Sequence, residues 1–202
     1  MTYNKNDDPV DNQWYRGFIM GQKIYYANTQ KKQINLTVPE NSEVIKELER
    51  EFKSNSYKVG KQKTIKLTGK KLQTILNKYV ANSFHTSFVV GLIESDFSIS
   101  FDIDVEPETK KINRSRQNIT LCSHPLIIRA LQKANITYSA RGQSLKITKQ
   151  MDCRRFLNSF NPRFFKIYRD DVLTLRKFVT SRSTMERVRL MNQYQSAKKI
   201  KA

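Results

Sequence analysis

Residues 88–102, FVVGLIESDFSISFD, predict a helix followed directly by a strand. The first half is apolar, and its small residues Gly91 and Ser95 are four positions apart, so both lie on one helical face and allow a second helix to approach closely. In the second half apolar and polar residues alternate, which is typical of a half-buried strand. Two acids, Glu94 and Asp96, lie at the junction, where the helix dipole disfavours an anion. We therefore expect a cation or another compensating group beside them.

Within this stretch, residues 89–97 (VVGLIESDF) resemble the LAGLIDADG motif of homing endonucleases and their maturase relatives. The Gly-Leu-Ile core and Asp96 match the motif, whereas Glu94 replaces its first Asp and Phe97 replaces its final Gly. The resemblance implies an α/β fold, a saddle of two αββαββα repeats related by a pseudo-two-fold axis, with the motif helices at the seam and the curved sheets on DNA. It also implies that the second acid of each motif holds a divalent metal over the scissile phosphates.

The rest of the chain contains the two copies that this fold requires. Four blocks recur in the same order, pairing residues 17–19 with 91–93, 34–37 with 119–122, 64–68 with 144–148 and 76–79 with 157–160. We therefore expect a disordered leader (1–12), a degenerate first LAGLIDADG repeat (13–84), a second repeat (85–180) and a basic C-terminal arm (181–202). Residues 13–22 and 87–96 are the expected motif helices, and the small residues of their seam are Gly17, Gly21, Gly91 and Ser95.

Local patterns predict the elements inside each repeat. Ser42 is the expected N-cap of a helix with an apolar face, and His124-Pro125 is expected to open the corresponding helix of the second repeat. Gly60 and Gly142 are the expected centres of two hairpin turns. The other predicted elements are strands 34–38 and 118–122, hairpin strands 57–59, 64–68, 136–140 and 144–148, and helices 70–79, 151–160 and 171–179.

The charge of the chain favours a polyanionic partner, because 37 Lys and Arg against 18 Asp and Glu give a net charge of +19. Codon bias in an AT-rich genome also raises Lys, Asn and Ile, but it does not explain the many Arg. No apolar run approaches the length of a membrane span, so no membrane partner is expected. Cys122 and Cys153 lack metal-ligand spacing and are expected to be reduced core residues.

The first repeat lacks the acids that the resemblance assigns to cleavage. Gln22 is at the position of Asp96, and Met20 is at the position of Glu94. An amide oxygen can ligate a hard cation but carries no charge. We therefore predict that double-strand cleavage is lost, that binding needs no cofactor, and that Mg²⁺ matters only if nicking survives at Asp96. Alternatively, Asp96 forms an ion pair with a neighbouring Lys or Arg. Arg16 also replaces the small residue expected beside the seam glycine.

Members of the family often have a basic residue near the metals, and Lys166 is close to that position here. Three roles are expected for Lys166: a relic catalytic cation, a contact to a phosphate, or a lysine exposed to solvent. The repeat alignment places His85 opposite it, and His85 and His124 have no metal-pair spacing. The C-terminal arm is expected to contact nucleic acid or a partner protein, or else to be a frayed, solvated helix.

The cationic strands are the expected nucleic-acid surface, because strand residues facing away from the helices contact nucleic acid in this family. Lys66 and Lys146 occupy equivalent positions of the two repeats, opposite the apolar strand faces. The expected contacts are Lys23, Lys31, Lys32, Lys58, Lys61, Lys63, Lys66, Lys110, Lys111, Arg114, Arg116, Arg141 and Lys146. Strand tyrosines either stack on unpaired bases or pack across strands, and these are Tyr25, Tyr57 and Tyr138.

Three functions remain open. The first, favoured by analogy, is a non-catalytic binder of structured RNA derived from a homing endonuclease: an intron maturase or a mitochondrial-ribosome-associated protein in a ribonucleoprotein assembly. The second is an active or nicking DNA endonuclease that uses Asp96 and a divalent metal. The third is a DNA-binding regulator. The expected location is the mitochondrial matrix or another organelle, and no homodimer is required because both repeats lie in one chain.

Overall fold

The computed structural model of the 202-residue chain describes residues 9–25, 33–40, 42–68, 86–106 and 112–200. These residues form α-helices and two antiparallel sheets, an α/β fold. The chain divides into two compact units, one made of Met1–Asp96 with Phe164–Ile167 and the other of Phe97–Arg163 with Tyr168–Ala202. Each unit is described below by itself.

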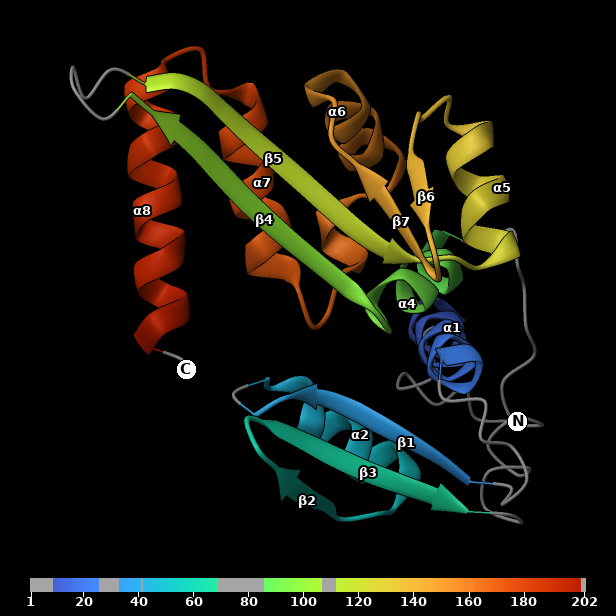
Figure 1. The fold of residues 1–202 in the computed structure, drawn as a ribbon. Helices are drawn as coiled ribbons and strands as arrows, with labels where there is room; N and C mark the ends of the chain where they lie inside the picture. Colours follow the sequence, from blue (N-terminus) through green and yellow to red (C-terminus); the bar gives the residue numbers. More distant parts are fainter. Residues whose placement is uncertain (1–8, 26–32, 41, 69–85, 107–111, 201–202) are drawn as a thin grey trace. The chain divides into compact units, whose positions relative to one another are not determined.

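The first unit contains both motif helices and one three-stranded sheet of order β1-β3-β2 (Figure 1). Its described elements are α1 (Pro9–Tyr25), β1 (Gln33–Pro39), α2 (Val44–Phe52), β2 (Ser56–Val59), β3 (Gln62–Thr68) and α4 (Thr86–Glu94). The apolar face of α2 is buried, and the helix ends at Lys53, whose left-handed conformation (φ 46°) stops it.

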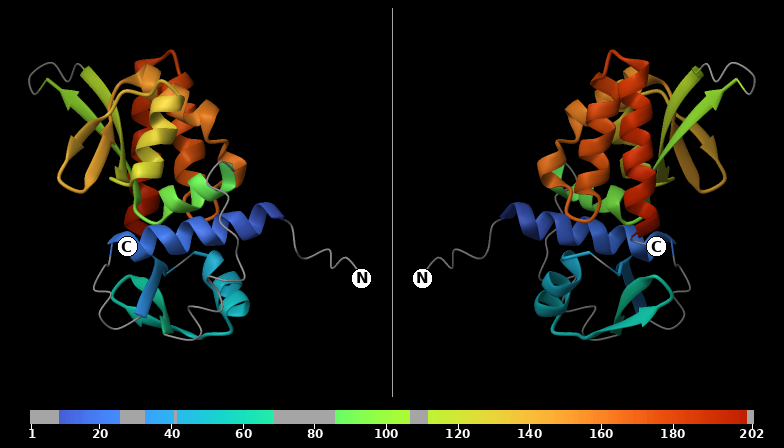
Figure 2. Two further views of the ribbon diagram at one scale, coloured as in Figure 1. Left: turned by 90° about the vertical axis from the view of Figure 1, so that its right-hand side faces the viewer. Right: turned by 90° about the vertical axis from the view of Figure 1, so that its left-hand side faces the viewer.

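The second unit has a four-stranded sheet of order β4-β5-β7-β6. Its elements are β4 (Phe97–Val105), β5 (Ile112–Cys122), α5 (Pro125–Lys133), β6 (Ser139–Arg141), β7 (Ser144–Ile147), α6 (Gln150–Ser159), α7 (Arg169–Thr180) and α8 (Thr184–Ile200). A single 3₁₀ turn, η2 (Pro162–Phe164), follows α6. The strands of this unit lie on one side and its helices on the other, so one face of the sheet is covered (Figure 2).

Strand pairing confirms the internal repeat. β1, β3 and β2 pair in the same order as β5, β7 and β6, and a helix follows the first strand of each set. The register agrees residue by residue with the sequence alignment, because Ile34 opposite Leu67 and Leu36 opposite Ile65 correspond to Ile119 opposite Ile147 and Leu121 opposite Leu145. These strand residues are all buried, so the alternation of the sequence fixes which face meets the helices.

Several local predictions are confirmed and some boundaries differ. Gly60 and Gly142 both have φ 58° at the hairpin turns, which a side chain disfavours. His124 caps α5, because its Nδ1 accepts the Leu126 N–H at 3.1 Å and Pro125 follows it. The Ser42 cap is wrong: the N-cap of α2 is Glu43, which makes no side-chain capping bond.

The bounds of several elements differ from the prediction, and one predicted helix lies outside the described residues. β6 begins at Ser139 rather than at residue 136, β4 and β5 extend beyond the predicted strands, and α1 begins at Pro9, inside the expected leader. The predicted helix 70–79 lies outside the described residues. In the described chain no helix has the length and apolar character needed to span a bilayer.

Aromatic packing ties the helices of the second unit to β4. Phe101 lies 4.7 Å from Phe178 of α7 and 5.0 Å from Tyr194 of α8, measured between ring centroids. The Tyr194 hydroxyl also donates to the Ile99 carbonyl at 3.4 Å, and burial raises the pKa of Tyr194 above its ordinary value. Most of the expected C-terminal arm is therefore a helix packed on its own unit. Cys122 and Cys153 are buried in the core, as predicted, and form no disulfide with each other, and burial raises the pKa of Cys153 to about 11.

Candidate nucleic-acid interface and motif-helix site

The two motif helices touch through their backbones. A Cβ added to Gly17 would overlap the Phe88 carbonyl oxygen, and one added to Gly91 would overlap the Trp14 carbonyl oxygen. These two contacts are equivalent under the repeat alignment, because Trp14 in α1 corresponds to Phe88 in α4. The crossing of α1 and α4 is thus locally two-fold symmetric, as the resemblance implies.

The third seam contact lies one turn further along. A Cβ on Gly21 would overlap the Ser95 hydroxyl, which donates to the Leu92 carbonyl at 2.7 Å. All four predicted seam residues, Gly17, Gly21, Gly91 and Ser95, therefore lie in the crossing. Arg16 does not prevent it: this residue is only partly buried, and desolvation lowers the pKa of its guanidinium.

Gln22 crosses the seam toward the end of α4. Its side chain is 2% exposed, and its Nε2 donates to the Ser95 carbonyl at 3.1 Å. Carbonyl groups at a helix C-terminus carry partial negative charge, so an amide donor there supplies compensation that an acid at the same position cannot. The Gln22 Oε1 is buried and has no hydrogen-bond partner among the described residues.

Asp96 is the next residue after Ser95, in the turn that ends α4. Its N–H donates to the Ile93 carbonyl at 3.3 Å, and its side chain is partly exposed. Desolvation raises the pKa of the Asp96 carboxyl. The alternative ion pair with Lys or Arg is not seen among the described side chains. Gln22 and Asp96 therefore lie on either side of one hydrogen bond, at the same end of the helix crossing.

The donor set at this end of the seam fits one weakly held hard cation, not a pair. Asp96 offers one carboxylate and Gln22 one neutral amide oxygen, while the Ser95 carbonyl already accepts from Gln22. The described residues contain no cluster of three His, Cys, Asp or Glu side chains suited to a metal ion. Mg²⁺ in proteins is commonly held by one or two carboxylates together with substrate phosphates. Asp96 could therefore help to hold Mg²⁺ only when the phosphate oxygens of a substrate supply further ligands.

Glu94 has a structural task that the motif alone does not reveal. The carboxylate is 2% exposed and accepts three N–H bonds: from the Trp14 indole at 2.6 Å, from the Lys166 backbone at 2.9 Å and from the Ile167 backbone at 2.8 Å. The compensation expected for an anion at this helix end is therefore supplied by N–H donors. Glu94 fixes the loop 164–167 onto the seam.

The side chain of Lys166 contacts Glu47 and two aromatic rings, whereas its backbone N–H is the group that donates to Glu94. Its ammonium bonds the Glu47 carboxylate at 3.1 Å and lies 5.1 Å from the Tyr15 ring centroid and 5.6 Å from that of Trp14. Glu47 also accepts from the Tyr15 hydroxyl at 3.2 Å. This placement favours a structural cation over the relic catalytic or phosphate-binding lysine that the sequence offered.

In the first sheet, register separates the predicted cations into two groups. Lys66 is exposed and lies on the open face, with Thr64 and Tyr57. Lys63 is two residues from the buried Ile65 and so lies on the same, helix-covered face, and Lys58 pairs opposite it. Lys58 also forms a 2.8 Å ion pair with Glu40. Lys58 and Lys63 thus lie off the predicted surface, whereas Lys61 is exposed in the hairpin turn.

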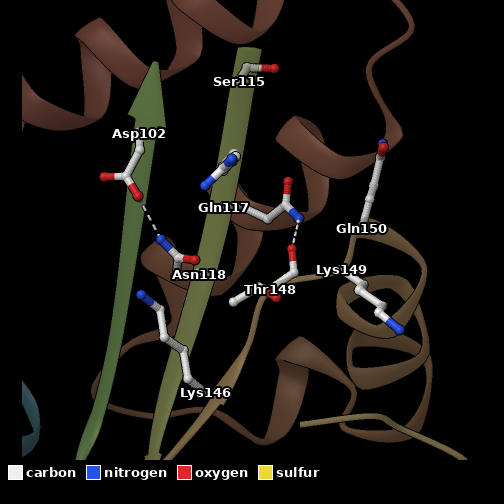
Figure 3. A pocket seen from close by; sticks show the side chains of 9 residues that line it. Asp102, Ser115, Gln117, Asn118, Lys146, Thr148, Lys149 and Gln150 are labelled. Carbon is white, nitrogen blue, oxygen red and sulfur yellow. Dashed lines mark hydrogen bonds between the residues drawn. The ribbon is translucent and has the colours of Figure 1, made fainter. Parts of the chain in front are cut away.

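In the second sheet, the open face is a mixed polar surface. Arg116 lies opposite Asp102, and Asn118 donates to the Asp102 carboxylate at 2.7 Å. Lys146 and Arg141 are exposed on the neighbouring strands. A groove of about 550 Å³ opens here, and Figure 3 shows Asp102, Asn118 and Lys146 along it. Sequence analysis missed Asp102 as a partner, although its alternation with Phe101 placed it on this face.

Some predicted contacts fall where the structure does not describe side chains. These are Lys23, Lys31, Lys32, Lys110, Lys111, Arg114, Tyr25 and His85. Tyr57 is 45% exposed on the open face of the first sheet, and Tyr138 is partly buried, so stacking and cross-strand packing both stay predictions.

Comparison with known proteins agrees with this architecture. No protein-family model and no curated protein matches the sequence. Among solved structures, the meganuclease I-SmaMI bound to uncleavable DNA matches with a TM-score of 0.63 at 11% identity, over 90% of this chain and 97% of that chain. The LAGLIDADG meganuclease I-CpaMI bound to uncleaved DNA matches with a TM-score of 0.59 at 10% identity, over 95% and 99%. The chain therefore has the LAGLIDADG homing endonuclease fold.

Proposed function

We propose that this chain binds nucleic acid and does not cleave both strands of a duplex. The observation that carries the proposal is Gln22, whose amide donates across the seam to the Ser95 carbonyl at the position of the missing acid. A neutral amide at this position brings no negative charge, so it holds a metal pair over two phosphates less well than the acid that it replaces. The intact crossing around it indicates that the fold does not depend on the acid pair.

Three described features support binding. The net charge is +19, Lys66 and Lys146 are exposed on open strand faces, and Arg116 lines the groove of the second sheet. Phosphate contacts by such cations supply most sequence-independent affinity for nucleic acid. The solved proteins with the same fold, I-SmaMI and I-CpaMI, are bound to DNA in their structures.

Structured RNA is the proposed ligand in preference to DNA, in an intron maturase or a mitochondrial-ribosome-associated protein. The proposal is supported by the loss of one acid of the pair, because a protein that does not cleave both strands of a duplex does not need a DNA duplex as its ligand. A DNA-binding regulator is the outcome if duplex DNA is recovered instead. Crosslinking the chain in its native cells and sequencing the bound nucleic acid decides between intron RNA, ribosomal RNA and DNA.

The recovered sequence then serves as substrate. Cloned as duplex DNA in a supercoiled plasmid, it is incubated with protein and Mg²⁺ or Mn²⁺, using wild type, Asp96→Asn and Gln22→Asp. We expect wild type to leave the plasmid supercoiled or at most nicked. Linear product from wild type that disappears in Asp96→Asn would refute the loss of double-strand cleavage.

Nicking is the second candidate function, and one observation favours it. Asp96 is partly exposed and directly follows Ser95, whose carbonyl accepts from Gln22, and the Gln22 Oε1 has no hydrogen-bond partner among the described residues. Together with substrate phosphates, this donor set suits a single Mg²⁺. I-SmaMI has been solved on uncleaved DNA with calcium ions, although that concerns a different protein. Open-circular product that requires both Mg²⁺ and Asp96 would establish this reading.

A further inference from the structure

Three arginines meet in a cleft on the helical side of the second unit. The cleft has a volume of about 400 Å³ and is lined by Arg154 of α6, Arg176 of α7 and Arg182 of the following loop. Leu157, Asn158, Val179 and Thr180 complete its lining, so among the described residues no strand residue and no acid contributes to it. It is therefore distinct from the groove on the open sheet face.

The arginine cleft is built rather than accidental, because one guanidinium is fixed in place. Arg154 donates from Nε and Nη2 to the Val179 carbonyl, at 3.0 and 2.8 Å. The Arg guanidinium has five N–H donors, so three remain for a ligand. Arg176 and Arg182 are exposed and have no acidic partner among the described residues.

Two of the acids near these arginines in sequence are already engaged. Asp152 is buried and pairs with Arg155 at 3.1 Å. Glu186 accepts from the Ser181 hydroxyl at 2.6 Å. No acid is among the described residues that line the cleft, so a ligand with distributed negative charge is the complement of its three arginines.

Chemistry and size identify that ligand. Planar guanidinium groups match phosphate oxygens in bidentate geometry, and Leu157 and Val179 give the cleft an apolar floor suited to a sugar or base. The volume lies at the small end of ligand pockets, which fits one nucleotide of a strand and not a duplex. We propose that the arginine cleft binds the phosphodiester backbone of a single nucleic-acid strand, at a surface separate from the two sheets.

This inference deepens the proposed function and rests on it only for the presence of nucleic acid. The test uses the full chain and a fluorescein-labelled 12-nucleotide uridine RNA, with anisotropy followed as salt is raised. Three double variants are compared, each removing two positive charges. They are Arg176→Ala with Arg182→Ala in the cleft, Arg116→Ala with Lys146→Ala on the sheet, and Arg129→Ala with Arg189→Ala as control, from exposed positions on α5 and α8.

We expect the cleft variant to bind the RNA about ten-fold more weakly than the control variant, with a salt slope smaller by about 1.4, since each lost contact to a single strand removes about 0.7. Circular dichroism melting must show all three variants folded, which the exposure of these residues favours. Crosslinked RNA should map to peptides of α6 and α7.

Three outcomes would overturn the inference, and they are distinguishable. If the cleft variant binds like the control while the sheet variant weakens, nucleic acid binds only the sheets and the proposed function survives. If wild type binds neither this RNA nor a duplex at low salt, the proposed function fails as well. The inference would also be overturned if the protein bound anionic phospholipid vesicles more tightly than RNA and the cleft variant lost that binding, which would indicate a lipid surface as the ligand.

Discussion

The helices α1 and α4 share one packing geometry and differ in the polar residues that it carries. Gly17 and Gly91 make the same backbone contact at positions related by the local two-fold axis. In contrast, Gln22 of α1 occupies the position that corresponds to Asp96 after α4. Met20 is partly exposed, whereas the equivalent Glu94 is buried under three N–H donors. The comparison teaches that the crossing is held by close backbone approach, so the acids are free to change while the fold persists.

The largest expected effect comes from breaking the shared part of this comparison. In Gly17→Val or Gly91→Val, the added Cβ overlaps a carbonyl oxygen of the facing helix, and neither backbone can move without opening the seam. We expect each variant to lose more than about 4 kcal/mol of unfolding free energy, which is diagnostic of a core clash. Urea unfolding followed by tryptophan fluorescence measures it, because Trp14 lies at the seam.

Gly60→Asn is the matched control for these variants. Gly60 has φ 58°, which Asn tolerates better than other side chains, and an added Cβ there meets nothing within 4 Å. Its stability should stay within about 1 kcal/mol of wild type. Equal losses at Gly60 and Gly91 would contradict the close approach.

The second prediction separates the first acid positions of the two copies. In Glu94→Ala, three N–H donors of the seam and the loop 164–167 lose their acceptor, so we expect a loss of about 3 kcal/mol or more. In Met20→Ala, a partly exposed side chain is shortened, and the expected loss is about 1 kcal/mol. Denaturant midpoints of the two variants measure the contrast, and equal losses would show that the copies do not differ here.

The third prediction restores the missing acid. Gln22→Asp loses the bond to the Ser95 carbonyl and adds a carboxylate beside Asp96, so we expect about 1–3 kcal/mol of destabilisation in EDTA. Ca²⁺ should then raise the melting temperature of Gln22→Asp well above its effect on wild type, because metal binding to the folded state alone stabilises it.

Gln22→Asn is the control for this experiment, since it shortens the amide without adding charge. Its melting temperature should not respond to Ca²⁺ beyond the wild-type response. If Gln22→Asp responds no more than Gln22→Asn, the two positions do not face a common site, and the account of the lost acid pair is wrong.

Much of the fold was predictable because its signals are local or repeated. Two periodic patterns predicted the packing that the structure shows. They are the spacing of Gly17 and Gly91 relative to their neighbours and the alternation of apolar and polar residues around Ile65 and Leu145. Ser42 failed because capping depends on a backbone angle, and the helix began one residue later, at Val44 after Glu43.

The site was less predictable because its contacts come from distant segments. The donors to Glu94 include the backbone of residues 166 and 167, more than seventy positions away. Lys63 lies on the helix-covered face because alternate strand residues point to opposite faces, a distinction that the position of a cation in a hairpin does not by itself give. The meeting of Arg154 with Arg176 depends on how α6 and α7 rotate against each other, which their separate sequences do not state.

The smallest expected effect concerns the helices that follow β1 and β5. α5 is capped by the Nδ1 of His124, whereas α2 has no side-chain cap. Burial lowers the pKa of His124 below its ordinary value of 6.5, so the folded state binds this proton less tightly than the unfolded state does. The stability it contributes is therefore present above pH 6.5 and is lost as the pH falls through the folded pKa, when protonation also removes the capping acceptor.

His124→Asn tests this, because Asn caps a helix without titrating. Between pH 7.5 and pH 5.5 the unfolding free energy of wild type should fall relative to that of His124→Asn, by no more than the ~1 kcal/mol that such a cap contributes. His85 and the carboxylates are common to both proteins and cancel in the difference. Glu43→Ala in α2 should cost under about 0.5 kcal/mol at any of these pH values, since no bond is lost. A pH-independent difference between wild type and His124→Asn would mean that the imidazole does not cap α5, and the asymmetry between the two copies would then be confined to their motif helices.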